Sequence, residues 1–142
     1  MRLYSKASEY AITALTNISI NSLDDHFTIK GLCEKTHVRA SYARKAFQSL
    51  SQGGILKAVT GPGGGYRFNK SPEKITLLEV IQCIDGNDAF DKCVLGPSFC
   101  NDNQGCPMHE TWKPIKKKVL TSFKKVTLDQ LIKLNKPVKK EK

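Results

Sequence analysis

The sequence predicts a mainly α-helical fold with a small β-wing, in which a winged helix-turn-helix precedes a long C-terminal dimerisation helix. Three observations lead to this fold class. Two short helical patterns are joined by a tight turn at residues 36–40, and a glycine-rich loop between two strand patterns follows them. Apolar residues then repeat every three or four positions from residue 109 to residue 126, which predicts one long amphipathic helix.

Length and composition favour a single small domain with an appended element. The chain has 142 residues, of which 39% are apolar, and no stretch approaches the ~18 apolar residues of a membrane span. No long apolar run or cleavage site follows Met1, so we expect no secretory signal, no membrane partner and a cytoplasmic location.

The net charge of +10, from 23 basic and 13 acidic residues, favours a polyanionic partner such as nucleic acid. Part of this charge belongs to residues 135–142, a lysine-rich stretch without apolar periodicity that we expect to be a disordered basic tail. Charge alone therefore leaves nucleic-acid binding and an ordinary solvated surface equally open.

Three short helices are predicted in the first fifty residues. The first has one apolar stripe, formed by Ala11, Ala14, Leu15 and Ile18. Thr28 is placed to cap the second helix, which ends near Lys35 and directs Ile29, Leu32 and Cys33 inward. We expect Cys33 to be a small core residue rather than a metal ligand.

The third helix, over residues 41–52, has two distinct faces. Its buried stripe consists of Ala43, Ala46, Phe47 and Leu50. The opposite face carries Ser41, Arg44, Lys45 and Gln48, which are residue types that reach base edges and phosphates. This pair of helices fits a helix-turn-helix, although any small helical hairpin with a solvated face would show the same periodicity.

The next segment favours the DNA-binding interpretation. Gly53 and Gly54 end the helix, and residues 55–59 and 66–68 are two strand patterns around a glycine-rich loop. Such a hairpin after a recognition helix is a wing, whose glycines let the backbone approach a phosphate closely. A nucleotide-binding loop is disfavoured because the loop lacks the Gly-Lys-Ser/Thr ending and leads to Tyr66 in a strand.

A capping box formed by Thr76 and Glu79 opens a fourth helix, and Gly86 ends it. Its inward stripe is Leu77, Val80, Ile81 and Ile84. We expect Cys83, beside this stripe, to be a half-buried structural thiol. Residues 87–108 show no convincing periodicity, and an irregular segment of this length in a small domain is usually functional or disordered.

Three of the five cysteines lie in that segment, with a histidine after them, in the pattern C-x6-C-x5-C-x2-H: Cys93, Cys100, Cys106 and His109. Clustered thiols in a cytosolic protein indicate metal binding or redox chemistry. The gaps are wider than those of zinc knuckles, so an iron–sulfur cluster fits better. His109 is the nearest fourth ligand and Glu9 a more distant one. A metal-free loop, or free thiols that sense oxidants, also fits the spacing.

The long helix over residues 109–126 carries an apolar stripe and many lysines. The stripe, which we expect to form the dimer contact, consists of Trp112, Ile115, Val119, Phe123 and Val126. It fits either a core or a seam with a partner helix, and we favour the seam because two-fold proteins read two half-sites. Thr127 is placed to cap a last short helix that carries Leu128, Leu131 and Ile132.

Taken together, these motifs resemble the IscR/NsrR-type winged-helix regulators, which are bacterial iron–sulfur transcription factors. The resemblance rests on Met1-Arg2-Leu3 with Ser5-Lys6 and Tyr10-Ala11, on Ser41-Tyr42, on the Gly-Pro-Gly-Gly-Gly-Tyr run at residues 61–66, on the three loop cysteines, and on the Trp112 helix that ends in Thr127-Leu128. It covers nearly all of the chain except the last ten residues.

The resemblance implies a homodimer, held by the long helix, that binds palindromic double-stranded promoter DNA. It also implies a cluster on Cys93, Cys100 and Cys106, with two irons favoured over four. The fourth ligand is His109 in the IscR-like pattern, which we favour, or Glu9 from the partner subunit in the NsrR-like pattern. Two departures leave the target sequence open: Thr60 stands where arginine is common, and Arg44 where an acid is common.

We therefore predict a transcriptional regulator that acts as a repressor. We predict no enzymatic activity, because no nucleophile–base pair and no paired carboxylates stand in catalytic spacing. The predicted DNA-binding residues are Arg2, Lys6, Thr28, Arg39, Ser41, Tyr42, Arg44, Lys45, Gln48, Gly63, Gly64, Gly65 and Arg67. The predicted divisions are the DNA-binding domain (1–86), the cluster loop (87–108), the dimerisation helix with a short terminal helix (109–134) and the tail (135–142). A cluster-free thiol or zinc regulator is the alternative, and a small iron–sulfur electron carrier is less favoured.

Overall fold

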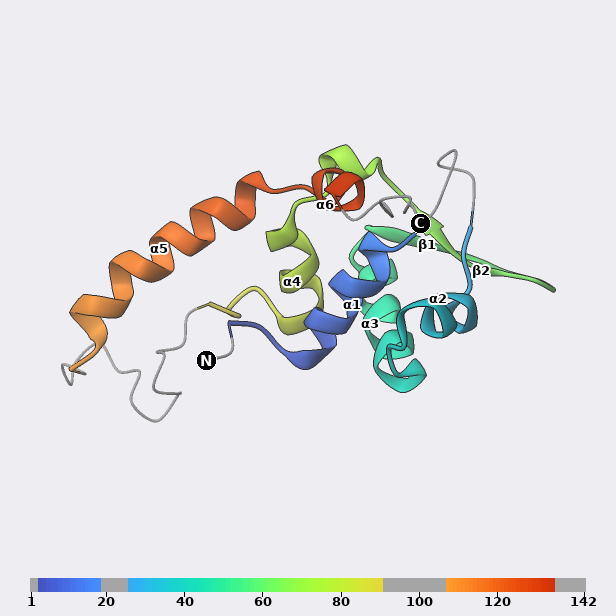
Figure 1. Cartoon of the computed structure of the whole chain (residues 1–142), viewed down its shortest axis with the longest axis horizontal. Coiled ribbons are helices and arrows are strands. Elements are labelled where there is room, and N and C mark those ends of the chain that lie inside the picture. Colours follow the sequence, from blue (N-terminus) through green and yellow to red (C-terminus); the bar gives the residue numbers. More distant parts are fainter. Residues whose placement is uncertain (1–2, 19–25, 91–106, 135–142) are drawn as a thin grey trace, which may run out of the picture.

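The computed structural model describes residues 3–18, 26–90 and 107–134, and over these ranges the chain is mainly helical with one two-stranded antiparallel sheet (Figure 1). The elements in chain order are α1 (Lys6–Thr16), α2 (Ile29–Thr36), α3 (Ala40–Gln52), β1 (Leu56–Val59), β2 (Gly65–Phe68), the 3-10 helix η1 (Pro72–Lys74), α4 (Leu77–Asp85), α5 (His109–Lys125) and α6 (Leu128–Leu134). The predicted fold class, with a winged helix-turn-helix and a long helix after it, is confirmed. Cys93, Cys100, Cys106, Arg2 and the tail lie outside the described residues.

Side-chain caps determine where several helices begin. The hydroxyl of Ser5 accepts a hydrogen bond from the Ser8 N–H at the start of α1, and Thr28 accepts one from the Gly31 N–H at the start of α2. Thr76 and Glu79 form a complete capping box on α4. The predicted caps of α2 and α4 are thus confirmed. Helix α3 begins at Ala40, one residue earlier than predicted.

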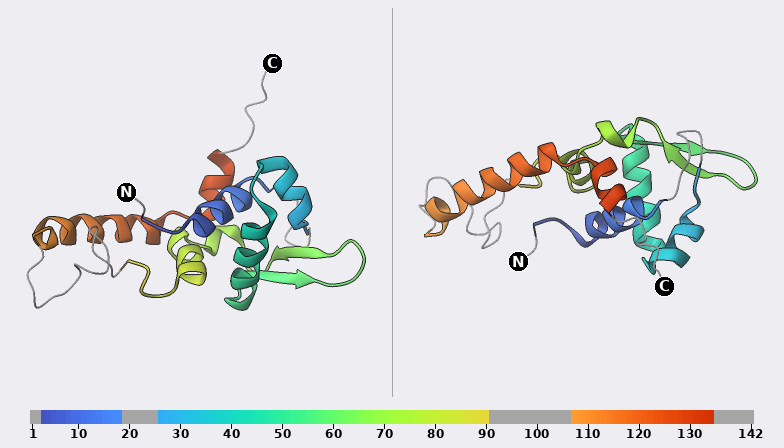
Figure 2. Two further views of the ribbon diagram at one scale, coloured as in Figure 1. Left: turned by 90° about the horizontal axis from the view of Figure 1, so that it is seen from below. Right: turned by 45° about the horizontal axis from the view of Figure 1, so that its top comes forward.

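The wing is a hairpin in which Leu56 pairs with Phe68 and Val59 pairs with Gly65. A third segment, which the sequence pattern did not reveal, extends it, because Phe27 forms an isolated antiparallel bridge with Tyr66. The hairpin projects beyond α2 and α3, away from α5 (Figure 2). The wing is therefore joined to the chain on both sides of the helix-turn-helix.

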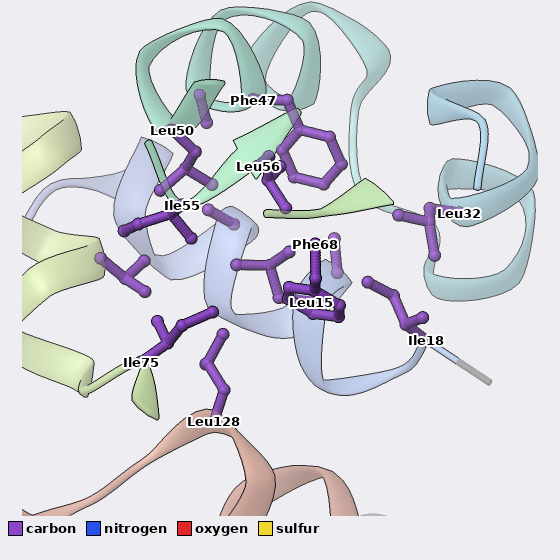
Figure 3. Packing of buried hydrophobic residues seen from close by; sticks show 14 residues of the cluster. Leu15, Ile18, Leu32, Phe47, Leu50, Ile55, Leu56, Phe68, Ile75 and Leu128 are labelled. Atoms are coloured by element: carbon purple, nitrogen blue, oxygen red, sulfur yellow. The ribbon is translucent and has the colours of Figure 1, made fainter. Parts of the chain in front are cut away.

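The main core lies between α1, α3, the wing strands and α4 (Figure 3). Phe47 and Leu15 are fully buried in it, and the ring of Phe47 packs edge to face against Phe27 at 5.9 Å and Tyr66 at 5.7 Å. Leu128 of α6 is also fully buried in this core. Helix α6 thus packs with the DNA-binding region, whereas the predicted division at residue 109 placed it with the long helix.

Helix α5 extends away from the rest of the described chain (Figures 1 and 2). It is anchored near its C-terminal end, where Phe123 contacts Phe90 at 5.6 Å and Tyr4 at 6.3 Å between ring centroids. The backbone before α6 is held by a bridge between Thr76 and Thr127. Within the described ranges, no helix is both long enough and apolar enough to cross a membrane.

Candidate nucleic-acid interface

The recognition helix α3 separates its apolar and polar faces cleanly. Ala43, Ala46, Phe47 and Leu50 are 0–1% exposed and form part of the core. The opposite face leaves four polar or cationic side chains exposed: Ser41, Arg44, Lys45 and Gln48. These positions follow a spacing of three, one and three residues, so they form one stripe along the helix that a DNA groove can accommodate.

Tyr42, a predicted DNA contact, packs against a second helix of the same chain. Its half-buried ring packs edge to face against Tyr10 of α1 at 5.0 Å. The ammonium group of Lys6 lies 5.9 Å from the centre of the Tyr10 ring. Tyr42 therefore joins the first turn of α3 to α1, and Lys6 lies at the same junction.

The glycines of the wing have structural reasons of their own. Gly61 and Gly63 have φ values of 95° and 73°, which favour glycine, and the Gly64 N–H donates to the Gly61 carbonyl at 3.0 Å. A Cβ on Gly64 would overlap the Val59 carbonyl oxygen, and one on Gly65 would overlap that of Phe27. Gly63, Gly64 and Gly65 are predicted DNA contacts, and the packing of the wing itself also requires glycine at positions 64 and 65.

Two cations lie opposite each other on the wing. Lys57 of β1 pairs with Arg67 of β2, and the alternation of the strand directs Arg67 away from Tyr66 and Phe68, which pack toward the core. Lys57 is exposed and Arg67 is half-buried. The position of Lys57 directly opposite Arg67 follows only once the hairpin register is known.

The remaining predicted DNA contacts lie at the ends of the helices. Arg39 is exposed directly before α3. The hydroxyl of Thr28 is engaged as the cap of α2, at 3.0 Å from the Gly31 N–H. His26, which the sequence did not indicate, places its Nε2 atom 2.7 Å from the Gly63 carbonyl oxygen at the tip of the wing. The wing tip is therefore connected to the segment before α2.

The two described cysteines, Cys33 and Cys83, are half-buried free thiols. Burial raises the pKa of the Cys33 thiol, and nearby Arg44 only partly offsets this effect. Burial and the neighbouring Glu79 carboxylate raise the pKa of Cys83, and a Cβ added to Gly53 would clash with the Cys83 sulfur. Cys83 packs against the main core as a half-buried thiol, as predicted, whereas Cys33 is half-buried on α2 outside that cluster.

The predicted cluster ligands are only partly described. His109 is the half-buried first residue of α5, and Glu9 is exposed in the first turn of α1. The described ranges contain no group of three or more His, Cys, Asp or Glu side chains close enough to hold a metal ion. The arrangement of the three loop cysteines around a cluster therefore stays a prediction.

The predicted dimer stripe on α5 is unevenly covered. Trp112 is 8% exposed, Val119, Phe123 and Val126 are half-buried, and Ile115 is 46% exposed. Phe123 of this stripe packs against Leu78 and Ile81 of α4, whereas Ile115 is left as an exposed large apolar side chain.

An exposed basic recognition helix followed at once by a wing defines the winged-helix class of DNA-binding proteins. A family model described as an iron-dependent transcriptional regulator, Rrf2, matches residues 4–134, and the chain belongs to this family. It is therefore a DNA-binding transcriptional regulator, as the resemblance in the motifs predicted.

Individual relatives agree with this assignment. The chain is 30% identical over 132 residues to the HTH-type transcriptional regulator IscR of Pectobacterium carotovorum, covering 93% of this chain and 79% of the relative. The fold matches CymR, the global cysteine regulator of B. subtilis, with a TM-score of 0.77 and 18% identity over 95% of this chain and 99% of the other. It also matches IscR of T. potens, with a TM-score of 0.71 and 20% identity over 97% and 91%.

Proposed function

We propose that the protein is a repressor whose affinity for promoter DNA is controlled by an iron–sulfur cluster that responds to iron–sulfur status, nitric oxide or redox stress. The observation that carries the DNA-binding part is the exposed stripe of Ser41, Arg44, Lys45 and Gln48 on α3, beside Lys57 and Arg67 of the wing. The family and the IscR relatives support the sensing part. A protein that binds promoters works where the chromosome lies, so a cytoplasmic location is part of the proposal.

Each element has its own task on DNA. The α3 stripe enters the major groove, where Arg44 and Gln48 reach base edges and Ser41 and Lys45 reach bases or phosphates. The wing follows the adjacent backbone, with Lys57 and Arg67 neutralising phosphates. Lys6 and Arg39 add positive charge near the same surface, and Arg2, which lies outside the described residues, is proposed as a further contact. Affinity should therefore fall steeply as the salt concentration rises.

The donor set suits the proposed cluster. Three thiolates, Cys93, Cys100 and Cys106, are soft ligands that hold iron–sulfur clusters, and His109 completes the set, with Glu9 of a partner subunit as the alternative. A two-iron cluster is favoured over a four-iron one. The bound cluster would supply a redox- and nitric-oxide-sensitive group whose gain, loss or modification changes the protein that carries it.

The proposed regulator acts as a homodimer through α5. Ile115 is exposed and Val119, one turn further along α5, is half-buried, so a second α5 that packs on this stripe would cover both. Two reading heads must match half-sites separated by about 34 Å, one turn of DNA, so a small change in their separation alters affinity strongly.

The test is anaerobic purification of the full chain, followed by visible and Mössbauer spectroscopy before and after exposure to nitric oxide. We expect charge-transfer absorption that is lost with nitric oxide, together with a changed affinity for a duplex selected by the protein from a random pool. A variant with Cys93, Cys100 and Cys106 replaced by alanine should be colourless and indifferent to nitric oxide. A colourless wild-type protein with stoichiometric zinc would instead support the zinc alternative.

A further inference from the structure

Ser5 and Asp85, which are 80 positions apart, are joined by two hydrogen bonds. The backbone N–H of Ser5 donates to Oδ2 of Asp85 at 2.9 Å, and the Ser5 hydroxyl donates to Oδ1 of the same carboxylate. The same hydroxyl accepts from the Ser8 N–H at 3.1 Å, so its donor and one of its acceptor positions are both used. Asp85 therefore completes the cap of α1 from a different helix.

The location of Asp85 is unfavourable for its own helix. It is the last residue of α4, where the carbonyl groups already create partial negative charge. Its carboxylate lies at the N-terminus of α1, where the partial charge is positive and a negative group is favoured. The charge of Asp85 thus stabilises the junction between α4 and α1 rather than α4 itself.

The junction continues to the recognition helix. Helix α1 packs against α3, and Tyr10 of α1 contacts the ring of Tyr42 in the first turn of α3. That turn also carries Ser41, and the N-terminal residues of a recognition helix are those that reach the bases. The hydrogen bonds at one end of α1 and the ring contact further along it therefore hold the base-reading end of α3 in place.

We propose that Asp85 is a positioning residue of the DNA interface: by anchoring Ser5 it fixes the N-terminus of α1, and through Tyr10 and Tyr42 it fixes the first turn of α3. The inference rests on the proposed role of α3 in reading DNA. Asp85 acts through α1 and does not itself contact DNA. Asp85 is followed by Gly86 and then by residues 87–108, so it also stands where the chain enters the predicted cluster loop.

The test is Asp85→Asn in the full-length protein. The amide oxygen still accepts from the Ser5 N–H, but its NH2 group does not accept from the hydroxyl. We expect about tenfold weaker binding to a duplex selected by the wild-type protein from a random pool, which corresponds to one charge-assisted hydrogen bond. Binding to a scrambled duplex should be unchanged, and amide hydrogen exchange of residues 40–45 should be faster.

Two further variants separate positioning from general stability. Thr76→Ala removes the cap at the other end of α4 without touching α1, so it should lower the Tm but leave binding to the selected duplex unchanged below the transition. Tyr10→Leu leaves the Ser5–Asp85 hydrogen bonds in place, so it should reproduce the selective loss even if Asp85→Asn does not fold.

Unchanged affinity of folded Asp85→Asn for the selected duplex, or an equal loss on the scrambled duplex, would overturn this inference but not the proposed function. Unchanged affinity of Tyr10→Leu would do the same. A wild-type protein that selects no duplex from the pool would overturn the proposed function and, with it, this inference.

Discussion

Phe27 and Tyr66 exchange two backbone hydrogen bonds of 2.8 Å, which join the segment before α2 to the second strand of the wing. The ring of Phe27 also packs edge to face against Phe47 of α3 at 5.9 Å. One residue thus contacts both parts of the proposed DNA interface. The orientation of the wing relative to the recognition helix therefore depends on the core and not on the hairpin alone.

Replacing Gly65 with alanine should loosen this connection. The added Cβ would overlap the Phe27 carbonyl oxygen, which belongs to the backbone and yields little. We expect a loss of about 1–3 kcal/mol in the free energy of unfolding, measured by urea denaturation. Gly63→Asn is the control, because this glycine has open space around it and asparagine tolerates its positive φ. Equal losses for the two variants would contradict the packing explanation.

His37 should be replaceable by glycine without loss of stability. It ends α2 with a φ of 63° and is the single non-glycine residue with positive φ in the described ranges. Glycine adopts this conformation freely, whereas valine is β-branched, so His37→Val should cost roughly 1–2 kcal/mol and His37→Gly should be neutral or stabilising. Thermal unfolding of the two variants measures the difference, and a more stable valine variant would refute it.

Glu79 should make stability depend on pH. Burial acts to raise the pKa of its carboxyl, but the hydrogen bonds from Lys70 and the Thr76 N–H outweigh it and hold the pKa below the ordinary value of 4.5. Because the folded pKa is lower than the unfolded one, the stabilisation is fully present above the ordinary value and is lost as pH falls through the folded pKa.

The matching experiment compares the Tm of Glu79→Gln with that of the wild-type protein from pH 7 to pH 3. We expect the wild-type protein to be more stable at pH 7 and the difference to shrink below pH 4.5. Asp129→Asn removes an ion pair with Lys133 of α6, whose side chain is largely exposed, and serves as a control with little pH dependence. A difference that grows toward low pH would reverse the assignment.

Ile115→Glu should weaken self-association. Burying an isoleucine contributes about 1.5–3 kcal/mol, so placing a charge there should raise the dimer dissociation constant at least about tenfold. Sedimentation over a range of concentrations measures it. Lys117→Glu introduces the same side chain on the far side of α5, and it should leave the association unchanged if Ile115 lies in the interface.

Arg44→Ala and Lys57→Ala should affect DNA binding in different ways. Loss of a base contact should cost about 1–3 kcal/mol and relax the preference at one base position, which a selection from random DNA would reveal. Loss of a phosphate contact should weaken all sequences alike and reduce the log–log salt slope by about 0.9. An equal loss for Arg44→Ala on every sequence would remove it from base reading.

Much of the local structure could be predicted because it depends on residues close together in the sequence. The caps at Thr28 and Thr76, the end of α4 at Gly86 and the two faces of α3 follow from side chains within about four positions of each other. The glycine-rich wing and the cysteine spacing likewise indicated the family without knowledge of the fold, and the family is confirmed.

The contacts that connect these elements could not be predicted in this way. Three of these contacts join residues that are more than thirty positions apart in the sequence. They are the hydrogen bonds of Ser5 with Asp85, the ring contact of Tyr10 with Tyr42, and the packing of Leu128 in the main core. Periodicity reports which face of a helix is apolar but not which partner covers it. The sequence by itself determined the elements and the class of protein. Only the tertiary structure decided that α6 joins the core, that Tyr42 packs on α1 and that Asp85 caps a helix other than its own.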